Sequence, residues 1–299
     1  MGSYSIRELE RLCNIKAHTL RIWEQRYHLL SPNRTNTNIR YYSDEDLKRV
    51  LRVALLINKG YRIGRIAHLT EAQLCLIVNS LENDPQICQE YHINQITTAM
   101  IELDEAGFEV IIEKCIAQFG LLDTVERVLY PFLTRIGIMW TTGSIHPAQE
   151  HFISNLIRQK IIVAIDALKI TPTANTKNYL LFLPEGEQHE IALLVAHYLL
   201  KAHNQIVTYL GANVPINDVI AVTQIKNIDY IFGVVTAARS CQQVKNYIYN
   251  LVELLPDHQF LFAGCRIKEI EMEKANVAIL NTVSDLSSHI ANNIPTYSF

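Results

Sequence analysis

Several common signatures are missing from this chain of 299 residues. The six cysteines include no Cys-x-x-Cys pair, which argues against a disulfide framework or a structural zinc site and suits a reducing compartment. No apolar run approaches the roughly 20 residues of a membrane span, and the first residues do not resemble a secretory signal. The dinucleotide-binding motif Gly-x-Gly-x-x-Gly and the P-loop motif are also missing. We therefore expect a cytoplasmic protein that does not associate with a membrane.

The charge is unevenly distributed along the chain. Residues 1–70 contain 13 Lys and Arg against 6 Asp and Glu, whereas the remainder contains 14 basic and 24 acidic residues. A basic first quarter on an acidic body predicts a nucleic-acid-binding head joined to something else. A solvated basic face without a partner is the simpler alternative. Hydrophobic residues make up 49% of the chain, enough to bury a sizeable core.

The basic first quarter contains the pattern of a helix-turn-helix. Ser5 and Glu8 have the spacing of a capping box in front of a short amphipathic helix. After a tight turn, a second helix is expected over residues 18–26, and the second helix of such a pair can enter the major groove of DNA. It carries candidate contacts to phosphates or base edges, namely His18, Thr19, Arg21, Trp23 and Arg26. Core packing is an equal alternative for Trp23.

A small hairpin, or wing, is expected after Ser31-Pro32 ends the second helix. It would place four side chains against DNA: Arg34, Arg40, Tyr41 and Tyr42. Asn38 stands near the tip of this hairpin, where asparagine tolerates left-handed backbone angles. A further helix, residues 47–59, follows the capping residues 43–46 and ends at Gly60.

The middle of the chain predicts a linker followed by a helical bundle. Residues 77–95 have the pattern of a linker. Helices are then expected over residues 96–105, 107–119, 121–141 with a bend at Pro131, and 147–167. The short breaks favour antiparallel neighbours in a four-helix bundle. Trp140, Glu150 and His151 stand near the junction of the last two helices, although core packing or the helix dipole would also explain them.

The last part of the chain predicts an α/β domain. Apolar runs at 179–183, 206–210, 230–235, 259–263 and 277–280 alternate with helical patterns. They indicate a parallel sheet of flavodoxin-like order, covered on both faces, with its ligand site beyond the carboxyl ends of the strands. His189 follows the first strand, and Glu187 could bond one ring nitrogen and raise the basicity of the other, which suits a metal ligand. A solvated loop histidine is the simpler alternative.

Two parts of the sequence resemble known families. Residues 4 to about 70 resemble the MerR-type winged-helix regulators through Thr19–Glu24, Leu30–Arg34, Arg40–Tyr42 and Gly60-Tyr61. Glu187-Gln188-His189 resembles the start of the cobalamin-binding signature Asp/Glu-x-His-x-x-Gly, with Ala192 where that signature has glycine. Residues 209–215, Thr236 and Ala263-Gly264 match the same corrinoid-binding Rossmann-like domains more loosely.

The whole chain resembles the CarH/LitR family of B12-dependent photoreceptor repressors. The most specific sign is Trp140, followed after nine residues by Glu150-His151. The resemblance implies that adenosylcobalamin binds between bundle and α/β domain, with His189 as the lower axial ligand to cobalt. It also implies that Trp140, Glu150 and His151 surround the adenosyl group. The remaining cofactor-binding candidates are Glu187, Ala192, Thr236, Ala263 and Gly264.

The resemblance implies a fold and a function. The fold is multidomain: an all-α winged helix-turn-helix head (1–76), the linker (77–95), a four-helix bundle (96–172) and an α/β flavodoxin-like cobalamin-binding domain (178–299). The function is that of a repressor, not an enzyme, which binds double-stranded operator DNA as a homotetramer in the dark and leaves it in the light. Two alternatives stay open: a MerR-type regulator sensing another tetrapyrrole, another ligand or a protein partner, and a corrinoid methyl carrier.

Overall fold

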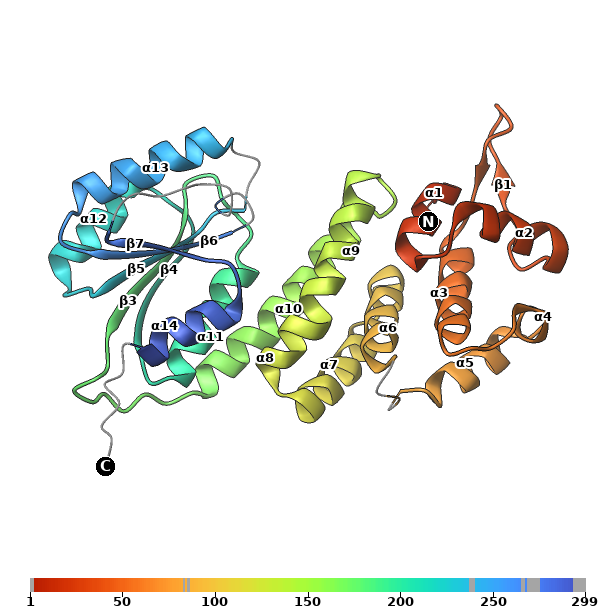
Figure 1. Ribbon diagram of the computed structural model, residues 1–299, viewed down its shortest axis with the longest axis horizontal. Coiled ribbons are helices and arrows are strands. Elements are labelled where there is room, and N and C mark those ends of the chain that lie inside the picture. Colours follow the sequence, from red (N-terminus) through yellow and green to blue (C-terminus); the bar gives the residue numbers. More distant parts are fainter. Residues whose placement is uncertain are drawn as a thin grey trace. The chain divides into compact units, whose positions relative to one another are not determined.

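The computed structural model describes residues 3–82, 84, 87–236, 240–264, 267 and 275–292. The chain forms two compact units, residues 1–156 and 157–299, and the boundary between them falls within helix α10 (Pro147–Ala167) (Figure 1). Within the described part of the chain, no helix has the length and apolar character needed to span a bilayer.

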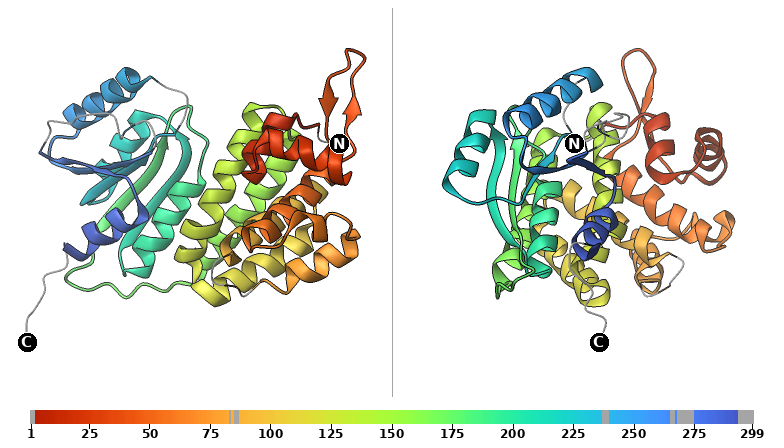
Figure 2. Two further views of the ribbon diagram at one scale, coloured as in Figure 1. Left: turned by 45° about the vertical axis from the view of Figure 1, so that its right-hand side comes forward. Right: turned by 60° about the vertical axis from the view of Figure 1, so that its left-hand side comes forward.

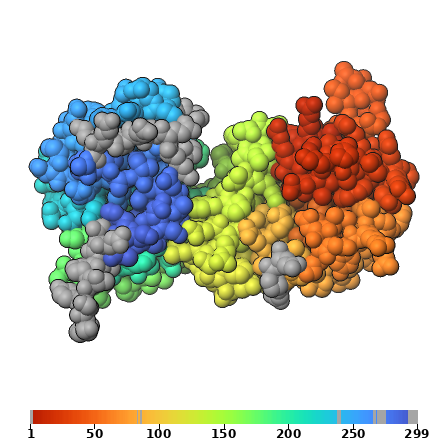
Figure 3. Space-filling model, viewed as in Figure 1, coloured from red at the N-terminus to blue at the C-terminus, as the bar shows by residue number. Residues whose placement is uncertain are grey.

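The first unit begins with the predicted winged helix-turn-helix. Its elements are α1 (Ile6–Cys13), α2 (Ala17–Tyr27), β1 (Asn33–Arg34), β2 (Arg40–Tyr41), α3 (Asp44–Asn58), α4 (Ile63–Ile66) and α5 (Glu71–Asn79). Ser5 and Glu8 form the predicted capping box of α1. The β1–β2 wing projects from the surface of this unit (Figure 3), and Asn38 has the expected left-handed backbone, with a φ of 63°. These local predictions are confirmed.

The same unit continues into the helices of the bundle. They are α6 (Cys88–Glu102), α7 (Glu105–Phe119), α8 (Leu121–Thr124), the π-helical segment η1 (Val125–Leu129), α9 (Tyr130–Thr141) and the first part of α10. The predicted linker 77–95 is wrong in its extent, because α6 begins eight residues before the expected start at Ile96. The missed turns are polar in sequence, but Tyr91 and Ile93 are buried, so tertiary packing stabilises them as helix.

The predicted bend at Pro131 takes the form of a π-helical segment. Proline has no backbone N–H, and its ring would clash with the carbonyl group four residues earlier in a regular α-helix. The chain widens just before this position: the N–H of Tyr130 donates to the carbonyl oxygen of Val125, five residues back. The resulting η1 segment separates α8 from α9, which ends with Trp140 and Thr141.

The second unit is a five-stranded parallel sheet covered by helices on both faces (Figure 1, Figure 2). The strands are β3 (Asn178–Pro184), β4 (Ile206–Val214), β5 (Tyr230–Val234), β6 (Gln259–Ala263) and β7 (Val277–Leu280), in the order β4-β3-β5-β6-β7. This order confirms the flavodoxin-like prediction. Helices α12 (Ile216–Ile225) and α13 (Cys241–Leu254) cover one face of the sheet, and α11 (Ile191–Ala202) and α14 (Val283–Asn292) pack on the other.

Candidate functional site

Three loops meet at the carboxyl edge of the parallel sheet. They follow β3, β5 and β6, and their described residues include Glu187, His189, Thr236 and Gly264, whereas Ala263 is the last residue of β6 and Ala192 lies in α11. The β5 and β6 ends are joined by a hydrogen bond from the N–H of Val235 to the carbonyl oxygen of Ala263, 2.8 Å long. In an open α/β sheet, this edge is where ligands bind.

Glu187 joins these loops from a buried position. Its side chain is 1% exposed. One carboxylate oxygen accepts from the backbone N–H groups of Gln188 (3.0 Å) and His189 (3.1 Å), and the other accepts from the N–H of Thr236 after β5 (2.7 Å). The backbone of Glu187 also accepts a hydrogen bond from the N–H of Asn213, at the end of β4. The β3 loop is therefore fixed to both neighbouring strands.

His189 is held by this buried carboxylate but is itself open to solvent. Its Nδ1 lies 2.6 Å from Oε1 of Glu187, and its side chain is 73% exposed. A carboxylate accepts only, so Nδ1 carries the proton and Nε2 presents its lone pair. The carboxylate thereby fixes the orientation and the tautomer of the ring. The predicted Glu187–His189 bond is confirmed, and the pair has the chemistry of a single, oriented metal ligand.

The small residues predicted beside this pair occupy the same edge. Gly264 has a φ of 134°, and a Cβ atom added there would lie 2.0 Å from the carbonyl oxygen of Val235. Glycine is therefore required at this close approach between two strand ends. Thr236 is part-buried above β5, and Ala263 ends β6. Ala192 is part-buried in the first turn of α11, directly behind the His189 loop.

A second polar cluster beside His189 was missed from the sequence. The carboxylate of Glu190 forms an ion pair with Arg158 of α10, and its other oxygen accepts a hydrogen bond of 2.8 Å from the hydroxyl of Tyr209 in β4. Tyr209 in turn stacks on His197, with ring centroids 5.1 Å apart. The position of Glu190 next to the Glu-x-His motif was a usable signal, but Arg158 and Tyr209 come from distant segments.

The first unit contains the three residues that were predicted to surround the adenosyl group. Trp140 lies in the last turn of α9 and is 47% exposed, an unusual position for a tryptophan that serves only as core. Glu150 and His151 lie in the first turns of α10, where Nδ1 of His151 is 3.0 Å from the Glu150 carboxylate. Glu150 also accepts a hydrogen bond from Ser154, which orients the carboxylate. The two helices are joined by the loop 142–146.

The predicted DNA-contacting residues fall into three groups. The basic and imidazole side chains of α2 and the wing are exposed: His18, Arg21, Arg26, Arg34 and Arg40. Thr19 and Tyr41 are part-buried. Trp23 and Tyr42 are 5% and 0% exposed, so both side chains are core. For Trp23 this is the alternative that the sequence left open, whereas the predicted contact of the Tyr42 side chain with DNA is wrong. Both belong to the core that supports α2 and the wing.

Glu24 positions the wing relative to α2, a role that the sequence did not reveal. Its carboxylate accepts a 2.7 Å hydrogen bond from the hydroxyl of Tyr42 and lies 3.2 Å from Nε of Arg40. Burial, together with the Glu24 carboxylate, raises the pKa of the Tyr42 hydroxyl, so this group stays a hydrogen-bond donor at neutral pH. The basic side chains of helix and wing are therefore presented by one rigid frame.

Comparisons with known proteins place this geometry in a family. The model "MerR HTH family regulatory protein" matches residues 4–73, and the model "B12 binding domain" matches residues 92–164. The HTH-type transcriptional repressor CarA of Myxococcus xanthus is 30% identical over 212 residues, which cover 70% of this chain and 68% of CarA. The chain belongs to this repressor family. It is a CarH-type, B12-binding-domain regulator with a MerR head, as the sequence predicted.

Two further similarities agree with this membership. CarH of Myxococcus xanthus is 26% identical over 263 residues, which cover 85% of this chain and 86% of CarH. The Methanosarcina barkeri monomethylamine corrinoid protein has a similar fold, with a TM-score of 0.56, 18% identity, and coverage of 69% of this chain and 100% of that protein. The B12 binding domain match falls on the bundle helices α6 to α10, where Trp140, Glu150 and His151 lie.

Proposed function

We propose that this family member is a light-responsive repressor. It binds adenosylcobalamin and operator DNA in the dark as a homotetramer, and light releases it from the DNA. The observation that carries the proposal is the exposed, carboxylate-held imidazole of His189 at the ligand-binding edge of an α/β sheet, in a chain that also has a MerR head.

The donor chemistry of the α/β unit fits a corrinoid. A corrin ring leaves one lower axial position for a protein ligand, and His189 offers one oriented nitrogen. The part-buried Thr236 and Gly264 would line the space for the displaced nucleotide tail. The chemistry supplied by the bound cofactor is a cobalt–carbon bond that light can break.

The residues of the first unit would recognise the upper face of the same cofactor. The exposed indole of Trp140 offers an apolar surface for the adenosyl group, and Glu150 and His151 offer hydrogen-bonding groups beside it. Contacts made to the adenosyl group and lost after it leaves are the differential interactions that a switch needs. In this proposal, loss of these contacts ends the assembly of the tetramer.

Assembly would matter because each head binds DNA through a small surface. When several heads are linked in one tetramer, binding of one head to the operator raises the effective concentration of the others there, without any new contact. Dissociation of the tetramer would then lower operator occupancy, even with each head unchanged. The basic side chains of α2 and the wing would supply phosphate and base contacts.

One alternative function has specific support. Ala192 occupies the place of the signature glycine, and Thr141 follows Trp140 where some family members have histidine. Both departures favour a MerR-type regulator that binds a different ligand or a protein partner. A corrinoid methyl carrier is disfavoured, because such a carrier has no use for a recognition helix and wing.

The test uses the purified full chain with adenosylcobalamin in the dark. Absorbance and elution volume are recorded before and after green light. A bound corrinoid spectrum and a light-dependent fall in oligomer size are expected. Binding without a change in assembly would refute the photoswitch but keep a cobalamin-binding regulator. No binding would favour the alternative ligand.

A further inference from the structure

The loop between Trp140 and Glu150 touches the DNA-binding head directly. Ser144 in this loop is 1% exposed, and its hydroxyl donates a 2.5 Å hydrogen bond to the carboxylate of Glu8. Glu8 lies in the first turn of α1, where its other oxygen accepts from the N–H of Ser5 and completes the capping box. The Glu8 carboxylate therefore caps the first helix of the helix-turn-helix and also binds the loop of the bundle.

The electrostatics of Glu8 agree with a functioning contact. Burial raises the pKa of the Glu8 carboxyl, but the hydrogen bonds from Ser144 and Ser5 outweigh burial, so that its pKa lies below the usual value. The carboxylate is consequently ionised at neutral pH. Hydrogen bonds to an ionised acceptor are about twice as strong as those between neutral groups.

A second polar connection leads to the head from α9, the helix that precedes this loop. The guanidinium of Arg135 donates to Glu90 and to Asn94 of α6, at 2.6 Å in each case. The amide nitrogen of Asn94 lies 3.4 Å from the carbonyl oxygen of Leu51 in α3. Arg135 is a turn and a half before Trp140 on α9. The middle of the helix that presents Trp140 and the loop that follows this helix are thus both connected to the head.

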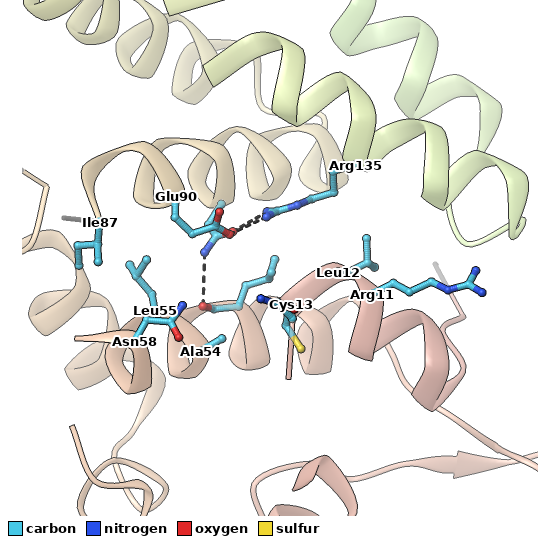
Figure 4. A pocket seen from close by; sticks show the side chains of 12 residues that line it. Arg11, Leu12, Cys13, Ala54, Leu55, Asn58, Ile87, Glu90 and Arg135 are labelled. Carbon is cyan, nitrogen blue, oxygen red and sulfur yellow. Dashed lines mark hydrogen bonds and ion pairs between the residues drawn. The ribbon is translucent and has the colours of Figure 1, made fainter. Parts of the chain in front are cut away.

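The contact between head and bundle contains a pocket that is partly open to solvent. A cavity of about 340 Å³ lies among α1, α3, α6 and α9, with Leu12, Ala54 and Arg135 in its lining. Figure 4 shows Arg135 reaching across it toward Glu90. A contact fixed by a few polar bonds beside a solvent-open pocket can change its arrangement at a lower cost than a close-packed apolar contact.

We propose that Ser144 is a positioning residue, through which the bundle sets the position of α1 and thereby the affinity of the head for DNA. The inference rests on the proposed function and adds a route within one subunit to the effect of assembly. The loop 142–146 joins the two helices that carry Trp140 and Glu150-His151. A ligand held by these residues would therefore influence the position of the loop. Helix α1 packs against α2 and α3, so its displacement moves the recognition helix.

The experiment compares variants of the full chain for DNA affinity with and without adenosylcobalamin in the dark. The DNA is a duplex selected from a random library with the wild-type chain. The ratio of the two affinities is the readout, and oligomer size is measured by light scattering in the same samples. Ser144→Ala is expected to lower the ratio about fivefold or more, a fold-change within the usual range of allosteric coupling, with oligomer size and cofactor spectrum unchanged.

Two further variants separate positioning from a loss of fold. Glu8→Gln keeps the capping box, because glutamine also serves at this position, but it weakens the acceptor for Ser144 and should give an intermediate ratio. Thr134→Ala removes a hydroxyl that bonds within α9 and should leave the ratio at the wild-type value. Melting temperatures of all variants show whether they fold.

The outcomes distinguish this inference from the proposed function. If the wild-type chain shows no effect of adenosylcobalamin on DNA affinity, the proposed function itself fails. If the wild type shows an effect and folded Ser144→Ala keeps the same ratio, the positioning role of Ser144 is wrong. A lower ratio accompanied by a smaller oligomer would also overturn it, because the effect would then come from assembly.

Discussion

Replacing Glu187 by glutamine tests the centre of the proposed cofactor site. Its two carboxylate oxygens accept four N–H groups, from the backbones of residues 188, 189 and 236 and from the ring of His189. A glutamine side chain has one acceptor oxygen. In its milder orientation, that oxygen keeps three of the four bonds, and the NH2 group faces the N–H of Thr236 at the former 2.7 Å.

The expected cost follows from this geometry. A hydrogen bond to a charged group contributes about 1.5–3 kcal/mol, and a buried donor left without an acceptor costs about 1–3 kcal/mol. We therefore expect Glu187→Gln to lower the free energy of unfolding of the α/β unit by about 3 kcal/mol. For a unit of this size, that corresponds to a fall in melting temperature of about 10 °C.

Calorimetry of the full chain measures this fall. The matched control is Glu185→Gln, which removes the same charge from an exposed position in the same loop. The Glu187→Gln variant should also bind a corrinoid with an altered spectrum, because the His189 ring loses its charged acceptor. If both glutamine variants melt within about 2 °C of each other, Glu187 does not hold the strand ends together as described.

Four other changes have defined outcomes. His189→Ala should leave the melting temperature almost unchanged, because the ring is exposed. The variant should nevertheless bind a corrinoid more weakly or change the absorbance of the bound corrinoid. A wild-type spectrum would exclude the cobalt-ligand role. Arg21→Ala should weaken DNA binding by about 1–3 kcal/mol if Arg21 contacts a base, or reduce the slope of log affinity against log salt concentration by about one if it contacts a phosphate. Cofactor spectra should stay unchanged. An affinity and a slope equal to those of the wild type would count against α2 as the recognition helix. Gly264→Ala should destabilise the α/β unit by about 2 kcal/mol or more in denaturant unfolding, because of backbone strain and overlap with Val235, and wild-type stability would contradict the close approach. Burial and the nearby Lys201 lower the pKa of His197 to about 4 from 6.5. Between these pH values the unfolded chain binds a proton that the folded chain does not. The free energy of unfolding should therefore decrease by up to about 3 kcal/mol as the pH is lowered through this range. His197→Phe should flatten that part of the profile, and an unchanged profile would exclude His197 as its source.

Local patterns predicted the parts of the molecule that depend on neighbours in sequence. The apolar runs gave all five strands and their order, although β4 continues to Val214 beyond the expected end at residue 210. The extra residues follow a register shift against β3 near Phe182, which no periodicity reveals. The Glu187–His189 bond was predictable because two residues separate the partners, and the comparisons confirmed the MerR head and the B12 binding domain.

What the sequence did not reveal depends on distant partners. Trp23 and Tyr42 have aromatic and polar groups suited to DNA, and their burial follows from packing between α2, the wing and the N-terminal segment. The Ser144–Glu8 bond joins residues 136 positions apart. The Glu190 cluster draws one partner from α10 and one from β4. Such contacts are fixed by the tertiary arrangement, and short motifs carry no trace of them.

The π-helical segment before Pro131 has a consequence for comparing this protein with its relatives. A π-turn adds one residue to an α-helix, and one residue rotates every following side chain by about 100° around the axis. The face on which Trp140 stands is therefore set by the η1 segment as well as by its own position in α9. Loss of a single residue within Val125–Leu129 would rotate the indole by this angle toward a different neighbour, although no residue of the Trp140, Glu150 and His151 motif had changed. In this family, a one-residue gap in an alignment can thus matter more than a substitution.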